Sequence, residues 1–152
     1  MRVGVPAEIK VLERRVGLTP ESVRELVAQG HEVVVESGAG LGIGADDERY
    51  RAAGASTVAD GAEVFAAADM VVKVKEPQAQ ERAMLRAGQL LFTYLHLAPD
   101  LAQTEDLLAS GATCIAYETV TDDEGGLPLL APMSEVAGRL SIEAAGMALR
   151  AN

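Results

Sequence analysis

The chain has 152 residues, the size of one domain, and carries a formal net charge of −10 at pH 7. Such a charge repels nucleic acid and anionic membranes, so neither is expected as a partner, and an anionic ligand would need local cationic groups. Hydrophobic residues make up 49% of the chain and aromatic residues only 3%, which predicts a core of Val, Leu, Ile, Ala and Met.

The single cysteine, Cys114, cannot form an internal disulfide and lies in the apolar run ATCIAY, so we expect a reduced, buried thiol. The N-terminus MRVGVPAEIK lacks the apolar segment of a secretory signal. No stretch approaches the roughly 18 continuous apolar residues that a membrane span requires. We therefore predict a soluble, cytoplasmic protein, and we assign no metal ligand.

Short runs rich in β-branched and other apolar residues alternate with helical stretches along the chain. The predicted strands are RVGV (2–5), EVVVE (32–36), ASTV (55–58), MVVKV (70–74), QLLFT (89–93) and TCIAY (113–117). Strands that alternate with helices and are apolar on both faces favour a mainly parallel sheet with helices on both sides. The sequence therefore predicts a single, doubly wound α/β domain of the Rossmann-like or flavodoxin-like kind.

Several of the intervening helices have recognisable ends. Thr19 is the expected N-cap of the first helix, with Pro20 at the first helical position and Gly30 just past the end. Asp60 and Glu63 form the pattern of a capping box. The segment PDLAQTEDLLASG also closes with a glycine. After the irregular stretch TDDEGGLPLLAP, Ser134 is the expected cap of a final helix through about residue 150.

The glycine-rich stretch SGAGLGIG follows the second predicted strand and formally resembles a dinucleotide-binding loop. Gly40, Gly42 and Ala45 satisfy G-x-G-x-x-G/A, and Asp60 lies where a ribose-binding acid is expected. However, the next helical turn opens with three acidic residues, 46–48, which would repel a pyrophosphate at the helix N-terminus. We therefore interpret the glycines as allowing tight turns and close backbone contact.

Three cationic or titratable residues follow predicted strands, at the edge of the sheet where open α/β folds bind ligands. Arg15 could bind a carboxylate with two parallel hydrogen bonds, and Lys75 could polarise a carbonyl oxygen or hold a carboxylate. His96 could exchange a proton near neutral pH. Each could instead be structural: a solvated arginine, or a hydrogen-bonded histidine. Lys73, two residues before Lys75, is interpreted as a structural side chain that snorkels to water.

These three groups together describe a site for a small α-keto or α-amino acid. Six stretches then resemble the alanine dehydrogenase and pyridine nucleotide transhydrogenase family, over about residues 1 to 141. They are MRVGVPAEIK, RRVGLTPESVRELVAQGHEVVVESGAGLGIG, VVKVKEP, LFTYLHLAPDL, TCIAYETV and LPLLAPMSEVAGRLS. The stretches YLHLAPDL, AYETV and LPLLAPMSEVAGR are more similar to the alanine enzymes than to the transhydrogenase α subunit.

The resemblance implies reversible, NAD-dependent oxidative deamination of L-alanine to pyruvate and ammonia. It implies that Arg15, Lys75 and His96 bind substrate, that Lys75 and His96 are also catalytic, and that Tyr94 and Met133 line the substrate pocket. Ser134 would lie near the cofactor. It also implies a homo-oligomer, commonly a hexamer. For Tyr94 and Met133 the alternative is core packing, and for Ser134 it is the helix cap.

Family members continue from the MSEVAGR helix into a Rossmann domain that binds NAD, and 152 residues do not contain it. We therefore expect residues 1–133 to form a substrate-side domain and residues 134–152 a helix that leads to the NAD-binding domain, with the chain inactive alone. Two alternatives remain open: a transhydrogenase-like domain that binds nucleotide, and a non-catalytic module for small-acid binding or assembly.

Overall fold

The computed structural model describes residues 1–150 of the chain. It divides into two compact units, Met1–Ile115 and a second unit that begins at Ala116. The first unit is built on six strands in the order β3-β2-β1-β4-β5-β6. Their bounds are β1 Arg2–Val5, β2 Glu32–Glu36, β3 Ser56–Val58, β4 Met70–Val72, β5 Leu90–Thr93 and β6 Thr113–Ala116. All six predicted strands are present, within two residues at each end.

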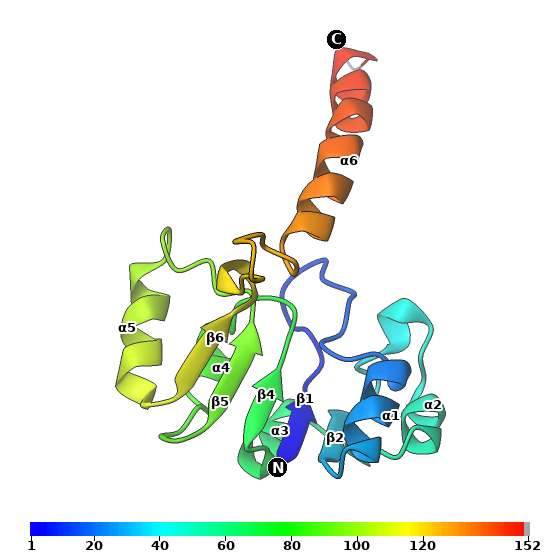
Figure 1. Ribbon diagram of the computed structural model, residues 1–152, viewed down its shortest axis with the longest axis vertical. Coiled ribbons are helices and arrows are strands. Elements are labelled where there is room, and N and C mark those ends of the chain that lie inside the picture. Colours follow the sequence, from blue (N-terminus) through cyan, green and yellow to red (C-terminus); the bar gives the residue numbers. More distant parts are fainter. Residues whose placement is uncertain (151–152) are drawn as a thin grey trace. The chain divides into compact units, whose positions relative to one another are not determined.

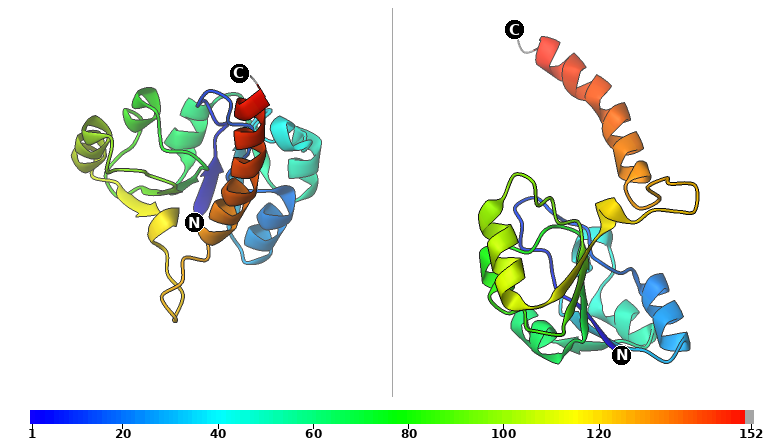
Figure 2. Two further views of the ribbon diagram at one scale, coloured as in Figure 1. Left: turned by 90° about the horizontal axis from the view of Figure 1, so that it is seen from above. Right: turned by 60° about the vertical axis from the view of Figure 1, so that its left-hand side comes forward.

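The first unit has five α-helices: α1 Pro20–Ala28, α2 Asp47–Ala52, α3 Gly61–Ala67, α4 Ala79–Arg82 and α5 Leu101–Ser110, with the 3-10 turn η1 Leu41–Ile43. Because crossovers between parallel strands are right-handed, α1 and α2 belong to one face, and α3, α4 and α5 to the other. Figure 1 labels these elements, and the left view of Figure 2 shows the green helices of residues 61–110 opposite the blue α1. The doubly wound, parallel α/β fold is therefore confirmed.

The sheet is buried between the two helical layers, so its strands are apolar on both faces. The central strands β1 and β2 contribute five buried valines, and α3 covers them with Val64 and Phe65. Strand register is parallel throughout the centre, with Val3 opposite both Val33 and Met70. Strand order reverses between β1 and β4, which both lie at the middle of the sheet. Ligands of open α/β sheets bind beyond the carboxyl ends of the strands at such a point.

The helix ends follow the sequence closely. The Thr19 side chain accepts a hydrogen bond from Ser22 N, and Pro20 begins α1. Asp60 caps α3 by accepting from Glu63 N, although the Glu63 carboxylate accepts from Ala59 N rather than from the N-cap itself. In the second unit, η2 Tyr117–Thr119 precedes α6 Ala131–Arg150. None of the helices in residues 1–150 is long and apolar enough to cross a membrane.

Candidate functional site

Arg15 lies in the long loop that joins β1 to α1, and this loop packs directly on the end of β4. A Cβ added at Gly17 would lie 2.4 Å from the carbonyl oxygen of Val72, so only glycine allows the approach. The loop therefore brings Arg15 to the carboxyl edge of the sheet, at the reversal of strand order.

The Arg15 guanidinium is held by Glu13, two residues earlier in the same loop. Arg15 Nε donates to Glu13 Oε1 at 2.8 Å and Nη2 to Oε2 at 2.5 Å, while the Arg15 main-chain N–H donates to Oε1 at 2.8 Å. These contacts, the guanidinium first, lower the pKa of Glu13 to about 2. The same carboxylate raises the pKa of Arg15. The ion pair with Glu13 therefore holds the permanently charged Arg15 guanidinium in place, and 42% of the Arg15 side chain is exposed.

Lys75 follows β4 and is half-buried, close to the same carboxylate. Its positive charge also lowers the pKa of Glu13, although less than Arg15 does. The Lys75 main chain is held on both sides, because its N–H donates to Glu8 Oε2 at 3.4 Å and its carbonyl accepts from Thr93 Oγ1 at 2.9 Å. The Lys75 main chain is thus bonded to Glu8 of the loop that carries Arg15, and the Lys75 charge acts on Glu13.

Tyr94 and His96 follow β5, the next strand along this edge. The two rings stack, with centroids 6.0 Å apart and planes 14° from parallel. Tyr94 is buried and its N–H donates to Val74 O at 3.2 Å, which joins it to the segment that carries Lys75. His96 is exposed and has a φ of 49°, a left-handed conformation that costs energy for a residue other than glycine. The strained residue thus lies exposed beside the buried Tyr94.

Lys73 corrects one expectation, because its side chain does not snorkel. The Lys73, Glu8 and Glu81 side chains are 1%, 1% and 4% exposed. The Lys73 ammonium lies 3.2 Å from Glu8 Oε2 and 2.7 Å from Glu81 Oε1. A buried ammonium requires paired charges, and here two carboxylates from other segments supply them. We call these three residues the buried triad.

The glycine-rich loop packs against the rest of the chain. A Cβ added at Gly42 would lie 2.1 Å from the Arg14 carbonyl oxygen, so the loop touches the backbone beside Arg15. Asp47 accepts from Gly38 N at 2.8 Å and from Ser37 Oγ at 2.6 Å. The Gly38 N–H, which a pyrophosphate in this loop would need, thus donates to the Asp47 carboxylate. This hydrogen bond holds the pKa of Asp47 below its usual range. The Gly38 N–H is therefore already paired within the chain.

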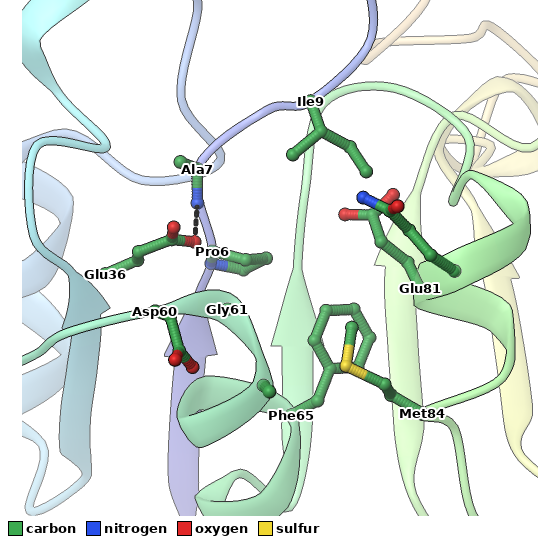
Figure 3. Close-up of a pocket in the computed structure, with 11 residues that line it drawn as sticks. Pro6, Ala7, Ile9, Glu36, Asp60, Gly61, Phe65, Glu81 and Met84 are labelled. Atoms are coloured by element: carbon green, nitrogen blue, oxygen red, sulfur yellow. Dashed lines mark hydrogen bonds between the residues drawn. The ribbon is translucent and has the colours of Figure 1, made fainter.

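A separate cavity of about 350 Å³ lies on the α3 and α4 face of the sheet, beside the loop after β1 (Figure 3). Ile9, Phe65 and Met84 supply apolar walls, and Glu36, which accepts from Ala7 N at 2.7 Å, lies at its rim. Arg15, Lys75 and His96 are absent from its lining. None of these three residues therefore lines the cavity, although Pro6 and Glu36 place it at the same carboxyl edge of the sheet, at the ends of β1 and β2.

Met133 and Ser134 belong to the second unit, and both lie inside α6. The helix begins at Ala131, so the expectation that Ser134 caps it is wrong. Pro132 falls in the first turn, where a missing N–H costs nothing, and the helix starts four residues before the position that a Ser134 cap predicts. Ser134 N donates to Leu130 O at 3.1 Å, and Met133 is 44% exposed.

Cys114 departs slightly from its expectation, because the thiol is free but half-buried rather than fully buried. This burial raises its pKa.

Sequence reasoning overlooked the carboxylates that hold these cations. The partners of Glu8 are 65 to 67 residues away, so nothing local indicates them, whereas Glu13 pairs with Arg15 only two residues along the loop. The only available signal was their place in the connection after a parallel strand, where chain segments converge.

Comparison with known families agrees with this geometry. Residues 4–137 match the family model of the alanine dehydrogenase/PNT N-terminal domain. The chain is 57% identical over 149 residues to an alanine dehydrogenase of Halomonas elongata, covering 98% of this chain and 40% of that protein. It is 55% identical over 143 residues to an alanine dehydrogenase of Mycobacterium tuberculosis, covering 94% of this chain and 38% of that protein.

Solved structures give the same result. An L-alanine dehydrogenase superposes with a TM-score of 0.89 at 52% identity, over 94% of this chain and 39% of that one. A transhydrogenase from Sinorhizobium meliloti has a TM-score of 0.73 at 33% identity, over 78% of this chain and 35% of that one. The chain therefore spans about two fifths of the curated relatives named above. By sequence and by fold, it belongs to the alanine dehydrogenase/PNT family and corresponds to the N-terminal domain.

Proposed function

We propose that this chain is the substrate-binding part of an NAD-dependent alanine dehydrogenase, which interconverts L-alanine with pyruvate and ammonia. One observation carries the proposal: the loop that carries Arg15 packs on the segment that carries Lys75 at the point where strand order reverses. Gly17 of this loop lies against Val72 O, and Glu8 of the loop accepts from the Lys75 N–H. Two cations so placed suit an α-keto acid, because a carboxylate and a neighbouring carbonyl need two separate positive contacts.

Each proposed residue has a distinct role. Arg15, oriented by Glu13, binds the substrate carboxylate, and Lys75 contacts the carboxylate or polarises the carbonyl oxygen. His96 donates or accepts the proton that the substrate nitrogen or oxygen exchanges. Its stacking on Tyr94 restricts the direction in which the imidazole points. Tyr94 is proposed to line the substrate pocket, and the same role is proposed for Met133.

NAD is proposed to bind chiefly outside this chain, where it accepts the hydride in the family's reaction. The glycine-rich loop supports this assignment, because Asp47 occupies its Gly38 N–H and Gly42 packs on Arg14. Ser134 is proposed to lie near the cofactor. We further propose the boundary of the substrate-side domain at residues 133 and 134, a cytoplasmic location and a homo-oligomer, hexameric as in the family.

Pyruvate binding followed by calorimetry tests the proposal. Wild-type chain should bind pyruvate, Arg15→Ala should lose most of that affinity, and Arg14→Ala should keep it. Arg14 is the matched control, because it is an exposed arginine in the same loop. An equal loss of pyruvate affinity in both variants would mean that only the net charge of the loop matters, and it would overturn the proposed site.

A second measurement separates the alternatives. NADH binding without pyruvate binding would favour a transhydrogenase-like domain, to which the 33% identical structure points. Reduction of NAD by the purified chain with L-alanine would show that it contains a working cofactor site, contrary to the proposal. Binding of neither ligand would favour a non-catalytic assembly module.

A further inference from the structure

Glu8 is a buried carboxylate three residues beyond β1, and its hydrogen bonds reach Lys75 through the main chain. Glu8 Oε1 accepts from Val74 N at 2.6 Å, and Oε2 accepts from Lys75 N at 3.4 Å. Oε2 also accepts from the Lys73 ammonium at 3.2 Å. One carboxylate thus bonds to three consecutive residues at the end of β4.

Burying such a group is costly, so its position is strongly constrained. Loss of water raises the pKa of Glu8, while the Lys73 ammonium and the Val74 N–H lower it and partly compensate. If the Glu8 carboxylate lost these partners, the free-energy cost of burying its charge would not be compensated. The loop after β1 is therefore anchored to residues 73–75 through one side chain.

Two further contacts make this anchor rigid. The Lys75 carbonyl accepts from Thr93 Oγ1 at 2.9 Å, and the Thr93 side chain is buried in β5. Lys10, in the same loop as Glu8, forms an ion pair with Glu76 next to Lys75. The Lys75 backbone is thus fixed to the neighbouring strand and to the loop that carries Arg15.

We propose that Glu8 is a positioning residue for substrate binding, which sets the distance between Lys75 and the loop that carries Arg15. This inference rests on the proposed function, because it assigns Glu8 to the same α-keto acid site. A site that binds a small acid through two contacts tolerates little displacement of either one. In a well-oriented site, a shift of about 1 Å can reduce the reaction rate as much as a hundredfold.

Glu81 supplies a matched control within the buried triad. Its Oε1 lies 2.7 Å from the Lys73 ammonium, as part of the same ion network, but its Oε2 accepts from Gln78 N in α4's N-cap. Glu8→Gln and Glu81→Gln each remove one carboxylate and leave Lys73 paired with the other. The two changes are therefore alike in size and charge, and they differ in contact with the Lys75 main chain.

The experiment compares pyruvate titrations of isotope-labelled wild-type, Glu8→Gln and Glu81→Gln chains by NMR. Glu8→Gln should weaken pyruvate binding about tenfold, shift the Val74 and Lys75 amide signals, and reduce the response of the Lys75 side-chain signals to pyruvate. Glu81→Gln should stay within about twofold of wild type and leave both amides in place. Thermal midpoints should confirm that both variants are folded.

Equal weakening by the two variants, or unchanged affinity in a folded Glu8→Gln chain, would overturn the role of Glu8. If Glu8→Gln does not fold, Glu8→Asp replaces it, because it keeps the charge and withdraws the carboxylate by one methylene. Wild-type affinity in Glu8→Asp would then reject the inference, and weaker binding with a shifted Val74 amide would support it. Absence of pyruvate binding in the wild-type chain would instead overturn the proposed function, and the inference with it.

Discussion

Replacement of Glu13 by glutamine tests how the Arg15 guanidinium is held. Glu13 accepts three hydrogen bonds from Arg15, and these lower its pKa from 4.5 to about 2. One pKa unit corresponds to about 1.4 kcal/mol, so the pair contributes at most about 3 kcal/mol to the free energy of unfolding. Because 42% of the Arg15 side chain is exposed, screening by solvent should reduce this to about 1 kcal/mol.

The expected pH dependence has a definite direction. The folded-state pKa lies below the unfolded one, so the stabilisation is fully present above pH 4.5 and is lost as the pH falls through about 2. Urea unfolding should thus show Glu13→Gln less stable than wild type at neutral pH, with a smaller difference near about pH 3. Glu48→Gln, which changes an exposed glutamate of α2, is the control. A difference that does not shrink in acid would refute the reasoning.

Three further predictions follow from the same contacts. Gly42→Ala should destabilise the chain by about 1–3 kcal/mol in urea unfolding, because the added methyl would lie 2.1 Å from Arg14 O. Lys73→Met should cost about 3–5 kcal/mol at neutral pH, since it leaves two buried carboxylates without their ammonium. His96→Gly should leave the thermal midpoint nearly unchanged, because relief of about 1 kcal/mol of backbone strain at φ 49° is offset by the lost stacking on Tyr94 and by the greater freedom of glycine in the unfolded chain. Calorimetry should show weaker pyruvate binding in this variant. Unchanged stability in either of the first two variants, or unchanged pyruvate affinity in the third, would contradict the corresponding contact.

The fold could be predicted because its signals are local. The alternation of β-branched runs with capped helical stretches predicts the order of strands and helices. Thr19 followed by Pro20 marks the start of a helix without reference to any distant residue. Ser134 shows the limit of such signals. Ala131 and Pro132 open α6, although both end the stretch that the sequence predicts to be irregular.

The site was only partly predictable, because its supporting contacts are distant in sequence. Arg15, Lys75 and His96 could be identified from their places after strands. By contrast, Lys73 and Glu8 are 65 residues apart, and no spacing rule relates them. The sequence likewise suggested a snorkelling Lys73, because a buried lysine can be recognised only with its carboxylates in view.

Mapping of pyruvate onto the chain by amide chemical shifts tests the central claim most directly, because the molecule offers three separate candidate regions. We predict that the largest changes fall in the loop of residues 8–16, in residues 73–76 and in residues 94–96. Changes confined to the glycine-rich loop of residues 38–44, or to the cavity lined by Glu36, Phe65 and Met84, would contradict the claim that Arg15 and Lys75 form the substrate site.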